Sequence, residues 1–83
     1  PNPFNPSTNF FIDVPSSGRL NISIYDVNGK IVNEVINTYV EAGRIYGSWS
    51  GKNMNGKNMP TGIYFMKVKT SLNYHVQKLA LVK

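Results

Sequence analysis

Alternation of apolar and other residues is the feature of this sequence that most limits its fold. Phe10, Ile12 and Val14 alternate with their neighbours, and this period of two recurs along the chain, whereas no stretch keeps the spacing of a helix. Successive side chains of a β-strand point to opposite faces, so the period indicates strands. Turn-forming residues separate these segments. The predicted strands are residues 10–14, 20–25, 30–39, 44–49, 62–70 and 75–83.

Six to seven short strands in 83 residues predict an all-β fold, a small antiparallel β-sandwich of immunoglobulin-like type. The chain is long enough for one domain, residues 1–83, in which residues 1–7 form an extended lead-in and Phe4 packs on the sandwich. We expect Trp49 to anchor the core between the sheets. A start at Pro1 without methionine predicts a fragment of a larger protein.

The alternation also predicts which side chains share a face. Leu20, Ile22 and Ile24 share one face of their strand, and the later groups Ile45, Gly47 and Trp49, then Leu79 and Leu81, do the same. In strand 62–70 we group Ile63, Phe65 and Val68 against Tyr64, Met66 and Lys67. Strand 30–39 has a blurred alternation, which predicts a β-bulge.

Two turns have nearly the same sequence, residues 26–30 (DVNGK) and residues 53–57 (NMNGK). Asp26 at the first position and Gly29 at the last suit a type I turn closed by a left-handed residue. Calcium loops also place oxygen ligands before a glycine, but here the glycine comes too early and no bidentate glutamate follows. The second copy has the neutral Asn53, so we interpret both segments as turns.

The net charge of +5 and a pI near 9.7 raise the question of a nucleic-acid or anionic partner. The nine basic residues are scattered singly along the sequence, without a basic run. This distribution favours solubility and protection of edge strands over a nucleic-acid site. No apolar run reaches the length of a transmembrane helix.

The residues available for catalysis or metal binding are few. The sequence has no cysteine and a single histidine, His75, so neither a disulfide nor a thiolate site can form and a catalytic triad lacks members. The four carboxylates, Asp13, Asp26, Glu34 and Glu41, belong to separate elements. We therefore predict no enzyme activity, no metal and no cofactor.

Several motifs together resemble the C-terminal sorting domain of the type IX secretion system, of type A. They cover essentially the whole chain: residues 2–8 (NPFNPST), 14–15 (VP), 25–30 (YDVNGK), 42–43 (AG), 49–51 (WSG), 55–57 (NGK), 60–65 (PTGIYF) and 78–83 (KLALVK). The same signature is similar to the immunoglobulin-like domain of the flagellar hook-capping protein, a neighbouring family with the same sandwich.

The resemblance to the sorting domain implies a non-catalytic module that follows an N-terminal cargo domain in a secreted protein. It implies transport of that cargo through the periplasm and an outer-membrane translocon to the cell surface or the medium. A sortase-like peptidase is the second partner it implies. Nucleic acid, cofactors and stable membrane insertion have no part in this role.

Matched residue by residue, the resemblance assigns partner recognition to six positions: Gly62, Tyr64, Lys78, Leu79, Leu81 and Lys83. Packing offers alternative roles, because the glycine could serve the preceding turn, the tyrosine could pack on a sheet, and the two leucines share a core face. The two lysines are the better contacts because packing does not need them. Ser50 and Asn53 stand where the family usually has aspartate, which weakens a cation site in loop 50–60.

A second hypothesis is a structural or carbohydrate-associated immunoglobulin-like module beside a catalytic domain. Sugar rings stack on flat apolar surfaces, so this hypothesis requires exposed aromatic residues such as Tyr39, Tyr46 and Tyr74 to lie on one face. Buried or scattered tyrosines would count against it.

Overall fold

The computed structural model describes residues 7–83, and these residues form six β-strands. The predicted packing of Phe4 and most of the lead-in therefore lie outside the described residues. The strands are β1 (Thr8–Val14), β2 (Gly18–Tyr25), β3 (Ile31–Val40), β4 (Gly43–Trp49), β5 (Gly62–Lys69) and β6 (Tyr74–Leu81). Within residues 7–83 no helix could cross a membrane.

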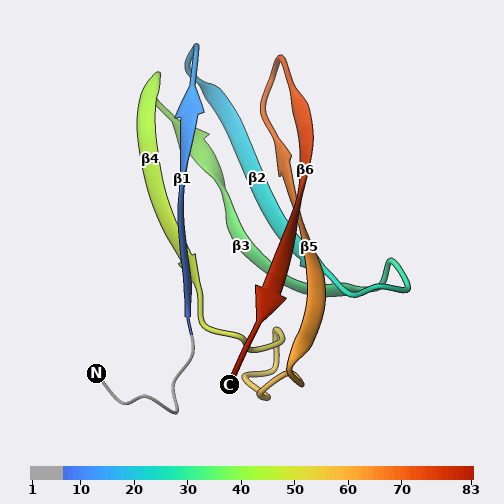
Figure 1. Cartoon of the computed structure of the whole chain (residues 1–83). Coiled ribbons are helices and arrows are strands. Elements are labelled where there is room, and N and C mark those ends of the chain that lie inside the picture. Colours follow the sequence, from blue (N-terminus) through green and yellow to red (C-terminus); the bar gives the residue numbers. More distant parts are fainter. Residues whose placement is uncertain (1–6) are drawn as a thin grey trace.

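The strands form two sheets that pack face to face (Figure 1). One sheet has the order β1-β4 and the other the order β3-β2-β5-β6, and every pairing is antiparallel. Among the described strands, β1 pairs only with β4, and β6 only with β5. The start of β1 and the end of β6 lie at the same end of the sandwich (Figure 1). The predicted all-β immunoglobulin-like sandwich is thus confirmed.

The core lies between the two sheets and includes the inward side of β2. Leu20, Ile22 and Ile24 are fully buried there, as their alternation predicts. Trp49 at the end of β4 is also buried, and its ring meets that of Tyr64 edge-on at a centroid distance of 5.1 Å. Its indole Nε1 donates to the carbonyl oxygen of Lys52 at 2.9 Å, so the one polar atom of this side chain has a partner. The predicted role of Trp49 as a core anchor is confirmed.

The predicted bulge in β3 is confirmed, and a second bulge accompanies it. Ile22 pairs with Ile36 while Ser23 pairs with Glu34, so Val35 is the extra residue of the first bulge. The register shifts again at the end of β2, where Val32 is left unpaired and is buried in the core. An extra residue changes which face the following side chains occupy, and this change explains the blurred alternation in the sequence.

Strand β5 corrects one of the predicted faces. Tyr64, Met66 and Val68 point into the core, whereas Ile63 lies on the outer face and is 40% exposed. The prediction that grouped Val68 with Ile63 was wrong because β5 keeps an unbroken period of two through its pairing with both neighbours. Burial of Tyr64 is possible because its hydroxyl donates to the carbonyl oxygen of Pro60 at 2.6 Å.

Candidate functional site

The outer face of the four-stranded sheet carries the strongest concentration of charged and aromatic side chains that the described residues offer. The outward residues of β2 are Arg19, Asn21, Ser23 and Tyr25, because the inward positions hold the core. Residues paired across an antiparallel ladder share a face, so the register extends this surface to the neighbouring strands. It adds Ile31, Glu34, Asn37 and Tyr39 of β3, Ile63, Phe65, Lys67 and Lys69 of β5, and Tyr74, Val76, Lys78 and Ala80 of β6.

A chain of hydrogen bonds fixes the polar side chains on this face. Arg19 donates to the Asn37 side-chain oxygen at 3.0 Å, and Asn37 Nδ2 donates to Glu34 Oε1 at 3.2 Å. The other Glu34 oxygen accepts from Asn21 Nδ2 at 3.0 Å, and Asn21 Oδ1 accepts from the hydroxyl of Ser23 at 3.0 Å. Both carboxylate oxygens of Glu34 are therefore occupied by hydrogen bonds within the domain.

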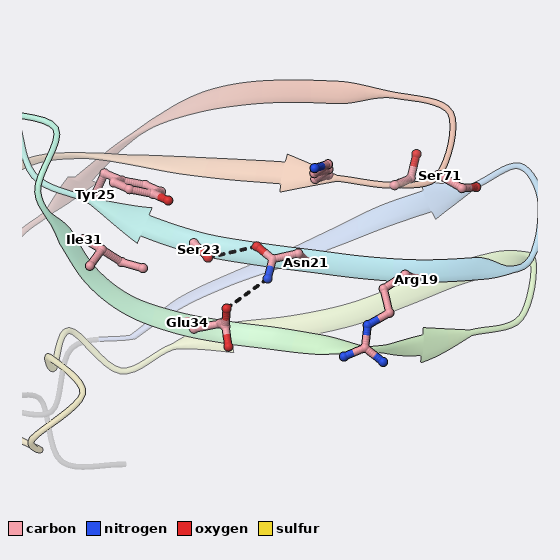
Figure 2. Close-up of a pocket in the computed structure, with 9 residues that line it drawn as sticks. Arg19, Asn21, Ser23, Tyr25, Ile31, Glu34 and Ser71 are labelled. Carbon is pink, nitrogen blue, oxygen red and sulfur yellow. Dashed lines mark hydrogen bonds between the residues drawn. The ribbon is translucent and has the colours of Figure 1, made fainter.

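All of these polar residues except Asn37 line a hollow of about 610 Å³ on the outer face. Figure 2 shows Tyr25 and Ile31 at one end of the hollow, Arg19 and Ser71 toward the other, and the bonded Ser23, Asn21 and Glu34 between them. The hollow thus combines a partly apolar end with a polar centre.

Four of the nine basic residues lie on this outer face: Arg19, Lys67, Lys69 and Lys78. Among the described residues Glu34 is the one carboxylate there. Lys67 places its ammonium 4.0 Å from the centroid of the Tyr25 ring, a cation–π contact that holds the lysine over the sheet. We call this surface, the outward residues of β2, β3, β5 and β6, the cationic face.

Sequence inspection missed the cationic face because its members are far apart along the chain. The signal that could have found part of it is the spacing of Lys67 and Lys69, since residues two apart in a strand share a face. Arg19 and Lys78 join them only through the pairing of β5 with β2 and β6.

The outer face of the two-stranded sheet has a different character, because its charges are paired. Arg44 bonds to both carboxylate oxygens of Asp13, with Nε–Oδ1 at 2.8 Å, and its guanidinium lies 4.1 Å from the centroid of the Phe11 ring. The hydrogen bond from Arg44 lowers the pKa of Asp13 below its ordinary value. Tyr46 packs beside Phe11 at a ring-centroid distance of 6.3 Å. This sheet leaves no net charge at its centre.

The two similar turns use their first side chain in the same way. Asp26 Oδ1 accepts the backbone N–H groups of Asn28 and Lys30, both at 2.9 Å. Asn53 Oδ1 accepts those of Asn55 and Lys57 at 3.0 and 2.9 Å, and a glycine of positive φ closes each turn. The oxygen therefore organises the backbone, which supports the interpretation of both segments as turns. Among the described residues no three His, Cys, Asp or Glu side chains are grouped to hold a metal.

The structure divides the six residues assigned to partner recognition between the core and the surface. Tyr64 and Leu81 are buried in the core, and Leu79 packs against it. Burial raises the pKa of Tyr64, with a smaller contribution from the negative charge of Asp26. These three side chains face inward, and only the partly buried Leu79 keeps some exposed surface.

The other three residues assigned to recognition do not form one surface either. Lys78 belongs to the cationic face, whereas Lys83 follows β6 and its backbone N–H donates to the hydroxyl of Thr61 at 3.3 Å. Gly62 starts β5 without a positive φ, and a Cβ added to it would contact nothing within 4 Å. The turn therefore does not require glycine at this position.

The three tyrosines of the carbohydrate hypothesis are exposed but scattered. Tyr39 and Tyr74 lie on β3 and β6, the two opposite edges of the four-stranded sheet, and Tyr46 lies on the other sheet. They do not form one stacking platform, which counts against the carbohydrate-associated role.

Residues 7–73 match the family model described as the FlgD Ig-like domain. The chain belongs to this family. Among solved structures, FlgD from P. aeruginosa superposes with a TM-score of 0.70 at 28% identity, over 90% of this chain and 58% of that one. FlgD from Xanthomonas campestris, described in connection with hook capping in flagellar assembly, gives 0.66 at 26% identity, over 93% and 56%. A comparison with curated protein sequences found no match.

The chain thus covers less than three fifths of the length of either FlgD structure. The predicted function as a type IX sorting domain, with an outer-membrane translocon and a sortase-like peptidase as partners, is wrong, because the family and structural matches are to FlgD. The motifs behind that prediction serve the sandwich itself. Trp49 and Tyr64 pack in the core, and Asp26 and Asn53 build turns, so the same residues suit both families.

Proposed function

We propose that this chain is the immunoglobulin-like module of a FlgD-type hook-capping protein and acts as a non-catalytic scaffold in flagellar assembly. The observation that carries the proposal is the match of residues 7–73 to the FlgD Ig-like domain. The two FlgD structures support it, since their similarity extends over at least 90% of this chain. Such a module works outside the cell, at the growing hook, by presenting a rigid surface to other subunits.

The physical basis of a scaffold role is the strength of the connections within each sheet. The pairing of β2 with both β3 and β5 joins the four-stranded sheet into one unit, and fully buried side chains of β2 lie at its centre. Side chains on the outer faces are thereby held in fixed relative positions, which lowers the entropy lost when a partner binds.

Deletion of residues 8–81 from the parent gene, with the ends joined in frame, tests the proposal. We expect cells that still produce the shortened protein to lack hooks in electron micrographs and to lose swimming. The matching region of P. aeruginosa FlgD, inserted in place of the deleted residues, should restore hooks at least in part. Normal hooks and swimming in the deletion strain would refute the hook-capping role.

A further inference from the structure

The cationic face has an excess of positive charge that the domain itself does not neutralise. Lys67, Lys69 and Lys78 make no ion pair among the described residues, where the one salt bridge joins Arg44 to Asp13 on the other sheet. The carboxylate of Glu34 is already bonded to two asparagine side chains. An approaching anion therefore meets the four cations of this face against a single carboxylate within residues 7–83, which favours acidic partners in particular.

Apolar side chains are exposed on the same face as these cations. Val76 is 44% exposed and Tyr74 63% exposed on β6, and Ile31 at the apolar end of the hollow is 39% exposed (Figure 2). Exposed apolar groups interspersed with charge on a sheet face are a composition typical of protein contact surfaces. A partner that covers them must itself carry apolar side chains.

The presence of both positive charge and exposed apolar side chains distinguishes between classes of acidic partner. A nucleic acid or an acidic polysaccharide would neutralise the lysines but would leave Val76, which pairs with Lys67, without apolar contacts. An extended polypeptide repeats its side chains on one face every two residues, about 6.7 Å. Lys67 and Lys69 on β5 have the same separation, so a segment whose side chains on one face, at every second residue, include both acidic and apolar ones matches the charges and the spacing.

We propose that the cationic face docks an acidic, extended polypeptide segment of a partner protein. Its carboxylates contact Lys67, Lys69 and Lys78, and its apolar side chains cover Tyr74 and Val76 on the neighbouring strand β6. The surface alone carries this inference, which holds whether or not the parent protein caps a hook.

Titration of the ¹⁵N-labelled chain with a synthetic peptide in which every second residue is glutamate or valine and the residues between are serine tests the proposal by NMR, because glutamate and valine then share one face. We expect amide shift changes on β5, β6 and β2 that weaken as salt is added, and no such changes with a peptide carrying glutamine in place of glutamate. The double variant Lys69→Gln/Lys78→Gln should raise the Kd about fivefold, because each exposed charge contact contributes modestly.

The matched control is Lys30→Gln/Lys57→Gln, which removes the same charge from the two turns. These side chains are exposed and lie off the cationic face, so we expect the Kd to change by about twofold or less through net charge alone. Equal weakening in both double variants, shifts confined to β1 and β4, or no shifts at millimolar peptide would each overturn the proposal. Tighter binding of a single-stranded oligonucleotide to the same face would overturn the choice of a polypeptide partner.

Discussion

Replacement of Gly47 by alanine should destabilise the sandwich, because an aromatic ring occupies the space that a Cβ needs. Gly47 on β4 pairs with Phe10 on β1, and both face the other sheet. A Cβ on Gly47 would lie 2.7 Å from Cε1 and Cζ of Phe10 and 3.2 Å from Cδ1 of Ile36. Carbon atoms prefer separations of about 3.5–4.0 Å, so the ring must move by about 1 Å.

The expected loss of stability follows from the free energy that this movement of the ring costs. Insertion of an extra methyl group into a packed core costs about 1–3 kcal/mol. A domain of 83 residues has a total stability of about 4–12 kcal/mol, so the Gly47→Ala change should lower the urea midpoint clearly. Trp49 is the one tryptophan in the sequence and is buried, so its fluorescence reports unfolding directly.

Two further variants decide whether the ring is the cause. Phe10→Leu removes the atoms that clash, so alanine at position 47 should cost under about 0.5 kcal/mol in that background. Gly62→Ala is the matched control, because its Cβ meets nothing within 4 Å and its stability should be unchanged or higher. If Gly47→Ala costs as much in the Phe10→Leu background as in the original sequence, the reasoning is refuted. A Gly47→Ala midpoint equal to that of the control would refute it as well.

The remaining predictions concern turns, a buried hydroxyl and a strained glycine. Asp26→Ala and Asn53→Ala should each cost about 1 kcal/mol in urea unfolding because the acceptor of two N–H groups is lost, whereas Asp26→Asn should be nearly neutral and calcium should leave the Tm unchanged. Because the pKa of Tyr64 is raised, the unfolded chain loses this proton first and stability should fall from about pH 10 upward. Tyr64→Phe should remove that fall and cost about 1 kcal/mol of stability at neutral pH. If stability still falls in the same way above about pH 10 in this variant, the reasoning is contradicted. Gly51→Ala should lower the Tm more than Gly29→Ala, since both have a positive φ but only the first brings a Cβ within 3.1 Å of a side chain on β6.

Local rules allowed most of the strands and turns to be predicted from the sequence. The alternation around Phe10 and Leu20 defined β1 and β2, and the DVNGK pattern defined a turn, in which Asp26 bonds the backbone. In β5, however, apolar residues occur on both sides of the strand, so the sequence alone did not show whether Tyr64 or Phe65 faces the core. The pairing of β5 with β2 and β6 places Tyr64 on the core side, where its hydroxyl bonds to Pro60.

The candidate site was much less accessible to prediction than the fold. Each lysine is isolated in the sequence, and their convergence depends on the order β3-β2-β5-β6 and on the register of each pair. The function predicted from the resemblance to the sorting domain was wrong for a different reason. Residues such as Trp49 are required by the sandwich, so they indicate the fold and do not distinguish secretion from assembly.

The positions of the start of β1 and the end of β6 determine how this domain responds to mechanical force. β1 and β6 are edge strands, one in each sheet, and the start of β1 and the end of β6 lie at the same end of the sandwich (Figure 1). Tension applied through these two ends pulls across the strands, so it separates β1 from β4 and β6 from β5 one hydrogen bond at a time. A pull along the strands would instead load all the bonds of a ladder together. The domain, although rigid when unloaded, should therefore open at low force when tension is applied through these two ends.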